Sequence, residues 1–356
     1  MPIAMTTAEP SPQRQASERS EEVFERLARP LGREIKLHCY RMLGSMHEAE
    51  DLEQESYLRA WRAFDGFEGG SFRAWLYRIA TNACLDALKN RKTVQRLLPD
   101  QHGPASSQMP ESGPAMEVAW LEPYPDAHLE GIADGQPNPE ARYAAREAVR
   151  LAFVAAIQQL PPRQRAALLL CDVLGWAANE AATLLGGSVA SINSALQRAR
   201  ETLARHYPNG RPQASLQPSP AQQELVGRYL SAWEGHDLDG LVALLKEDAT
   251  ITMPPWLQWY AGRPAIRAFF AMAWKSCRGM RLVATAANGQ PAFAVYARTD
   301  ADPRLAANAI HVLTLEEDKI SAVTMFLQPR MFEAFGLPLT LAEDAEGEVR
   351  LTPQHG

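Results

Sequence analysis

The chain has 356 residues, of which 46% are hydrophobic, and it carries a formal net charge of −6 at pH 7. This length predicts two or three domains, and the hydrophobic share allows each of them to bury a core. No apolar run approaches the roughly 20 residues of a membrane span, and the start, MPIAMTTAEPSPQRQ, lacks the basic and apolar blocks of a signal peptide. We therefore expect a cytoplasmic protein.

The cysteines also limit the class to which the protein can belong. Cys39, Cys84, Cys171 and Cys277 lie far apart in the sequence and form no C-x-x-C pair. We interpret them as reduced thiols of a cytosolic protein. Their spacing does not predict a zinc site, and we expect neither a metal nor a cofactor.

Composition changes divide the chain into segments. These are a polar tail (1–20), a helical segment (21–92), a linker rich in Pro, Gly, Ser and acid (93–139), a second helical segment (140–207), a Pro-rich linker (208–220), an α+β segment (221–340) and a tail (341–356). The first linker is predicted to lack fixed structure for most of its length, although its aromatic stretch WLEPYPD is suited to docking on a neighbour. In the α+β segment, two amphipathic helices precede alternating segments that predict a curved antiparallel sheet.

Two helices are predicted in the first helical segment, on either side of DGFEGGS. On the first of them, Asp51, Glu55 and Leu58 share a face led by acids, which suits a basic protein partner better than DNA. The second is expected to begin after Ser71, a good N-cap residue. One side of this helix carries an aromatic ring, a basic side chain and an amide, a combination that suits the binding of unpaired nucleotides. A surface aromatic residue among solvated charged residues would show the same pattern.

The second helical segment is the basic part of the chain. Residues 149–206 contain six Lys or Arg against three Asp or Glu, and local charge decides where a polyanion docks. Residues 163–174 and 176–185 predict two helices, with Gly186 suited to end the second. A third helix is expected over 188–205, so the segment predicts a helix-turn-helix.

The third of these helices is predicted to have two unlike sides. Its apolar stripe consists of Val189, Ile192, Leu196, Ala199 and Leu203. The opposite side carries Ser191, Ser194, Gln197, Arg198, Glu201 and Arg205. Small and hydrogen-bonding side chains let a helix enter the major groove, although the solvated face of a bundle helix has the same composition.

Two stretches carry a family resemblance. AEDLEQESYLRAWRAFDGFEGGSFRAWLYRIATNACLD resembles region 2 of the sigma-70 family, and LPPRQRAALLLCDVLGWAANEAATLLGGSVASINSALQRARETL resembles region 4. The lack of an intervening region 3 is similar to the extracytoplasmic function (ECF) sigma factors. The resemblance implies an initiation subunit that binds core RNA polymerase and recognises the −10 and −35 elements of promoter DNA.

The resemblance also implies roles for residues at matching positions. The polymerase-binding surface would consist of Asp51, Gln54 and Glu55. The −10 element would be contacted by Phe67, in the loop 65–71 that traps a flipped base, and by Trp75, Arg78, Asn82 and Asp86. The −35 element would be read by Ser188, Ser191, Asn193, Ser194, Gln197, Arg198 and Arg200.

One departure from the family concerns the −35 helix. Many ECF members have Thr/Ser-Val-Lys-Ser-Arg where residues 191–195 of this chain read SINSA. Two basic side chains are therefore missing, and we expect weaker phosphate contacts at this position.

Residues 220–335 resemble the SnoaL-like (NTF2-like) fold, a cone of helices closed by a bent sheet, as in ECF sigma factors of the SigG/SigJ type. Together with the two sigma regions, this predicts a multidomain protein of two all-α domains and an α+β cone. This fold often holds a pocket, for which the candidates are Trp256, Trp259, Tyr260, Tyr296, His311 and Met325. We expect no catalytic residue and no enzyme activity. A histidine inside an apolar cone can act as a general base, but the pattern around His311 is equally typical of a hydrogen-bonded core histidine. The resemblance implies that this domain contacts the sigma domains and modulates them.

Two other functions fit parts of the sequence. One is a ligand-responsive DNA-binding transcription factor fused to a SnoaL-like enzyme. The other is a repressor that binds duplex DNA alone. The first helical segment argues against both, because a repressor needs neither an acidic polymerase-facing surface nor a base-trapping loop.

Overall fold

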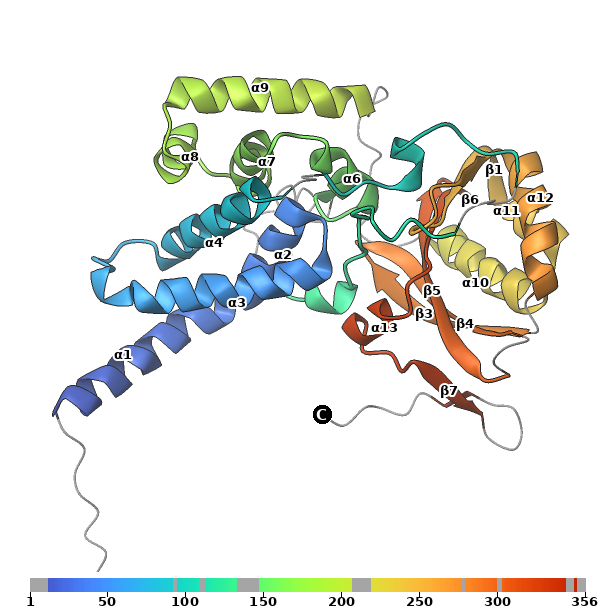
Figure 1. The fold of residues 1–356 in the computed structure, drawn as a ribbon, viewed down its shortest axis with the longest axis horizontal. Helices are drawn as coiled ribbons and strands as arrows, with labels where there is room; N and C mark the ends of the chain where they lie inside the picture. The colour runs from blue at the N-terminus through green and yellow to red at the C-terminus, as the bar shows by residue number, and fades with distance from the viewer. Residues whose placement is uncertain are drawn as a thin grey trace, which may run out of the picture.

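The structure is a computed structural model that describes residues 12–91, 95–108, 113–132, 147–206, 219–276, 279–299, 303–343 and 349–350. We name its parts the N-terminal module (12–91), the linker (95–132), the middle module (147–206) and the C-terminal domain (219–350). Figure 1 shows the two helical modules side by side, with the C-terminal domain next to both. Cys277 lies outside the described residues.

The N-terminal module consists of four α-helices. They are α1 (Pro12–Ala28), α2 (Gly32–Leu43), α3 (Met46–Arg62) and α4 (Phe72–Lys89). The Ser45 hydroxyl caps α3 by accepting from the Glu48 N–H, and the Ser71 hydroxyl caps α4 by accepting from the Ala74 N–H. Ser71 is therefore the N-cap that the sequence predicted.

The described part of the linker has a fixed structure, contrary to the sequence-based expectation. It contains short 3₁₀ turns at Pro99–Gln101 and Asp126–His128. Trp120, Leu121 and Tyr124 are buried, as expected for a docking segment. The composition was misleading because these few aromatic and apolar side chains provide enough burial to order the surrounding polar residues.

The middle module forms the predicted helix-turn-helix with shifted boundaries. Its helices are α6 (Leu151–Gln158), α7 (Pro162–Leu168), a π-helical turn (Leu169–Val173), α8 (Ala178–Leu185) and α9 (Val189–His206). Gly186 ends α8 in the left-handed region, at φ 63°. In α9 the predicted stripe is buried except for Val189, which is 44% exposed. Val189 is the first residue of α9.

The C-terminal domain pairs helices with a mixed sheet. Its helices are α10 (Pro220–Glu234), α11 (Leu238–Leu244), α12 (Arg263–Ala273) and α13 (Met331–Ala334). Its strands are β1 (Leu245–Thr252), β2 (Trp259–Ala261), β3 (Gly279–Ala287), β4 (Gln290–Arg298), β5 (Leu305–Glu316), β6 (Lys319–Phe326), β7 (Thr340–Glu343) and β8 (Val349–Arg350). The main path runs β2-β1-β6-β5-β4-β3. The β1–β6 pair is parallel, so the sheet is not wholly antiparallel as predicted.

The two faces of this sheet pack in two different hydrophobic cores. Phe293 and Val295 of β4 belong to a core shared with α10, α11 and α12. Ala294 and Tyr296 of the same strand belong to a core that continues into the linker and both helical modules. Because side chains alternate along a strand, one face of the sheet closes the cone and the other faces the rest of the protein.

A tight turn of the C-terminal domain reaches three other parts of the chain. Asn288, in the two-residue turn between β3 and β4, is fully buried and has φ 57°. Its side-chain amide donates to the Tyr40 hydroxyl (2.9 Å) and the Val149 carbonyl (2.8 Å). Its Oδ1 accepts from the Tyr124 N–H (2.9 Å), and its own N–H donates to the Tyr124 carbonyl (2.8 Å). One residue thus joins both modules and the linker.

The two helical modules are also joined by a buried arginine. Arg165 of α7 donates from Nε and Nη2 to the carbonyls of Ile157, Gln158 and Leu160, at the end of α6. Its Nη1 donates to the Gln158 side chain and to the Met42 carbonyl, in the last turn of α2. The five donors of the guanidinium are satisfied, and one cation caps the carbonyl ends of helices from both modules.

Candidate nucleic-acid interface

Aromatic rings anchor the turn that leads into α4. The Phe67 ring centroid lies 5.6 Å from that of Phe72 and 5.2 Å from that of Trp75. Phe24 of α1 lies 5.2 Å from Phe64 and 5.9 Å from Phe72. These packed rings position the predicted base-trapping loop against the start of α4. Sequence reasoning missed Phe24, although its aromatic character in an amphipathic helix was a usable signal.

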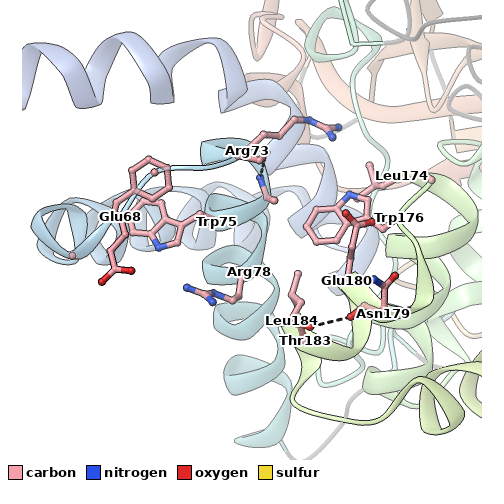
Figure 2. Close-up of a pocket in the computed structure, with 16 residues that line it drawn as sticks. Glu68, Arg73, Trp75, Arg78, Leu174, Trp176, Asn179, Glu180, Thr183 and Leu184 are labelled. Atoms are coloured by element: carbon pink, nitrogen blue, oxygen red, sulfur yellow. Dashed lines mark hydrogen bonds between the residues drawn. The ribbon is translucent and has the colours of Figure 1, made fainter.

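Three of the five residues predicted for the −10 element line one cleft. Phe67, Trp75 and Arg78 lie on its N-terminal-module side, while Asn82 and Asp86 are exposed farther along α4. Figure 2 shows α8 and the preceding turn forming the opposite wall. The cleft has a volume of about 680 Å³.

The predicted polymerase-binding residues lie on α3 and form a polar surface. Asp51 and Gln54 are exposed. Glu55 accepts from Arg59 Nε at 2.8 Å, and Arg59 Nη1 also donates to Asp86 on α4 at 3.2 Å. The two carboxylates raise the pKa of Arg59. Arg59, which sequence reasoning missed, therefore connects the predicted polymerase surface with the predicted −10 surface.

The predicted −35 residues divide into capping, paired and exposed groups. Ser188 and Ser191 cap the start of α9 reciprocally, since each N–H donates to the hydroxyl of the other at 3.1 Å. Arg200 makes a two-pronged ion pair with Asp172 at 2.9 and 2.7 Å, which raises its pKa. The remaining predicted residues are exposed on one helix: Asn193, Ser194, Gln197 and Arg198.

The predicted pocket residues of the cone do not line one cavity. Tyr296 faces away from the cone interior and donates its hydroxyl to the Pro338 carbonyl at 2.9 Å. Trp259 Nε1 donates to the Gly103 carbonyl at 2.8 Å, and the Tyr260 hydroxyl donates to the Gln108 carbonyl at 2.9 Å. Both contacts are with the linker. Trp256 is half-buried at the edge of the helix-covered core.

His311 and Met325 are neighbours in register on β5 and β6. Both are buried in the core of the cone, where His311 Nδ1 is 2.9 Å from the Tyr229 hydroxyl. The Trp233 ring centroid is 4.8 Å from that of His311. Burial lowers the pKa of His311 to about 3, so the imidazole is neutral at pH 7. This environment is typical of a hydrogen-bonded core histidine.

Two absences hold for the part of the chain that the structure describes. No group of three His, Cys, Asp or Glu residues is placed to hold a metal ion there. Among the described helices, none has the length and apolar character to cross a membrane.

Comparison with known families matches three parts of the chain. Residues 27–94 match sigma-70 region 2, residues 150–203 match sigma-70 region 4, and residues 226–323 match the SnoaL-like domain. The first two matches cover the modules that carry the surfaces described above. The third covers α11, α12 and most of the sheet of the C-terminal domain.

Individual relatives extend these matches over most of the chain. The ECF RNA polymerase sigma factor SigG of Mycobacterium tuberculosis (strain H37Rv) is 45% identical over 319 residues, which is 88% of this chain and 83% of the relative. SigW of Bacillus subtilis (strain 168) is 32% identical over 47% of this chain and 79% of its own length. The crystal structure of M. tuberculosis SigJ has the same fold, with a TM-score of 0.58 and 24% identity over 91% of this chain and 99% of that one. The chain belongs to the ECF RNA polymerase sigma factors.

Proposed function

We propose that the chain is a sigma subunit that binds core RNA polymerase in the cytoplasm, recognises −35 and −10 promoter elements and promotes strand opening. Asp51, Gln54 and Glu55 would contact the polymerase. The residues assigned above to α4 and its preceding loop would capture the −10 strand, and those of α9 would read the −35 element. The observation that carries this proposal is the ring cluster of Phe67, Phe72 and Trp75 beside exposed Arg78, which suits unpaired bases.

We further propose that the C-terminal domain has no catalytic role and instead modulates the sigma modules. Support comes from the cone interior, where His311 is buried among Tyr229, Trp233 and Phe293. The Asn288 turn supports the regulatory role. Both promoter elements must be reached across roughly two helical turns of DNA, so modules that share a cleft have to separate. Contacts that hold them together would therefore restrain initiation.

The direct experiment is transcription in vitro with core polymerase on candidate promoters, combined with a footprint of the reconstituted holoenzyme. We expect protection at both elements and an opened −10 region. Tight binding of the protein alone to duplex DNA, with no promoter opening, would instead favour a repressor. The fused-enzyme alternative is not favoured, because region 2 and the full-length relatives belong to sigma factors.

The polymerase surface can be tested by charge reversal. We expect Asp51→Arg to abolish co-purification with core polymerase, because an exposed acidic surface would lose its complementarity to a basic partner. Glu247→Arg, an exposed reversal on β1 of the C-terminal domain, is the matched control and should co-purify normally. Co-purification of the Asp51→Arg protein at the wild-type level would contradict the assignment.

A further inference from the structure

The side of α9 opposite its buried stripe faces outward from the molecule. Figure 1 shows α9 along the upper edge, with α7 and α8 below it. Ser194, Gln197, Arg198, Glu201 and Arg205 lie along this side, and all of them are exposed. Glu201 lies in the middle of the row, because Gln197 precedes it by one turn and Arg205 follows it by one turn. A duplex that meets α9 from outside would therefore meet the Glu201 carboxylate.

The negative charge of Glu201 stays on this outward side. Glu201 is the single acidic residue in the sequence of α9. Arg200, its neighbour, is ion-paired with Asp172 at 2.7 Å. Arg205 donates to the Glu201 main-chain carbonyl and to a hydroxyl of the same turn. The Glu201 carboxylate instead accepts a hydrogen bond through Oε1 from Gln197 Nε2, at 3.0 Å.

A carboxylate on a helix that faces DNA distinguishes between the groups it meets. It accepts hydrogen bonds and repels phosphate. In the major groove the donors are the amino groups at adenine N6 and cytosine N4, whereas guanine O6, guanine N7 and thymine O4 accept. Each base pair carries one of these amino groups, on the strand of its adenine or cytosine. A carboxylate in a fixed position therefore distinguishes a base pair from the reversed pair.

The bond to Glu201 also orients the Gln197 amide. One Nε2 hydrogen is donated to Glu201, which leaves Oε1 as an acceptor and the second N–H as a donor. Adenine is complementary to these two groups, because its N6 donates and its N7 accepts. One helical turn rises about 5.4 Å, which lies between one and two base-pair steps of about 3.4 Å. Gln197 and Glu201 are therefore spaced to contact neighbouring base pairs.

From this arrangement we propose that Glu201 is a specificity-determining residue of the −35 contact. Its Oε2 accepts from adenine N6 or cytosine N4 of one base pair, and its Oε1 holds the Gln197 amide toward an adenine of the neighbouring pair. This inference rests on the proposed function and deepens it, since it names the chemical groups that the −35 element presents to α9. Because the carboxylate repels phosphate, it also weakens binding to duplexes that lack these amino groups.

The test is promoter binding and transcription by the reconstituted holoenzyme on a library randomised over the −35 element, with the −10 element unchanged. For wild type, we expect two neighbouring positions at which reversal of the base pair weakens binding by roughly 10-fold. Glu201→Gln should reduce this discrimination at one position to roughly 3-fold or less, because an amide both donates and accepts. Gln197→Ala should remove the adenine preference at the neighbouring position.

The affinity for unrelated DNA gives a second readout for Glu201. Removal of one negative charge from the outward side of α9 should strengthen binding of the Glu201→Gln holoenzyme to duplex without a −35 element by roughly 2- to 5-fold. The matched control is Glu224→Gln, the same substitution at an exposed position of α10. It should leave both the base preferences and the affinity for unrelated duplex at the wild-type level.

Base preference separates a reading role from a structural one. If Glu201 only stabilised α9, Glu201→Gln would weaken binding to all promoters equally and keep the wild-type preferences, and this result would overturn the assignment. Wild-type preferences at unchanged affinity would overturn it as well. A wild-type holoenzyme that transcribes from no promoter, or that has no −35 preference, would remove the proposed function itself, and the assignment of Glu201 would fail with it.

Discussion

Replacing Arg165 by methionine is expected to lower the stability of the protein by about 3 kcal/mol or more. The substitution keeps a long apolar stem but removes the five donors of a fully buried guanidinium. The carbonyls of Met42 and Leu160 would then lose this donor in a buried site, and each unpaired group costs free energy. Burial lowers the pKa of Arg165 to about 9. Because this value is still above 7, the guanidinium remains charged at pH 7.

Urea unfolding followed by circular dichroism measures this effect, with Arg198→Met as the matched control. Arg198 is exposed on α9, and its replacement should change stability by no more than about 0.5 kcal/mol. Because Met42 belongs to α2, we also expect Arg165→Met to separate dyes placed on α3 and α9 in an energy-transfer experiment. Equal stability of the two variants would show that the shared helix cap contributes little.

The second large effect is expected at Asn288. Asn288→Gly keeps the left-handed backbone accessible, since glycine adopts positive φ without strain. It removes the side-chain bonds to Tyr40, Val149 and Tyr124. Loss of these buried hydrogen bonds should cost about 2–4 kcal/mol. If these contacts restrain the sigma modules, transcription in vitro should rise.

Glu317→Gly is a close control for this substitution. Glu317 lies in the turn between β5 and β6 of the same sheet, has φ 54° and is exposed. The Glu317→Gly substitution should leave both the stability of the protein and its transcription near the wild-type level. A stability loss for Asn288→Gly with no rise in transcription would argue that the turn has only a structural role.

The sequence predicted the elements better than the contacts between them. Gly186 and Ser71 ended and began helices as expected, because these signals act within a few residues. The −10 candidates Phe67, Trp75 and Arg78 came together because they lie within three turns of one helix and its preceding loop.

Contacts between distant segments had no such local signal. Asn288 was part of an ordinary Asn-Gly hairpin turn, and nothing near it in the sequence shows that Tyr40 and Val149 lie beside it. Tyr296 was grouped with His311 by residue type, yet the two belong to different cores of the same sheet. The face of a strand that meets the cone depends on strand register, which composition does not fix.

The face of the C-terminal sheet that lies away from the cone interior affects how long the activated protein would persist. Part of this face is covered within the domain, since Tyr296 packs on Phe332 of α13 with ring centroids 5.1 Å apart. The end beside the β3–β4 turn, with Ala287 and Ala292, belongs to the core that continues into the linker and the helical modules. Release of the sigma modules onto polymerase would expose this end, and exposed apolar surfaces associate with other proteins. An activated molecule would then be prone to self-association or to capture by chaperones, so the released form would be short-lived unless another surface covers it.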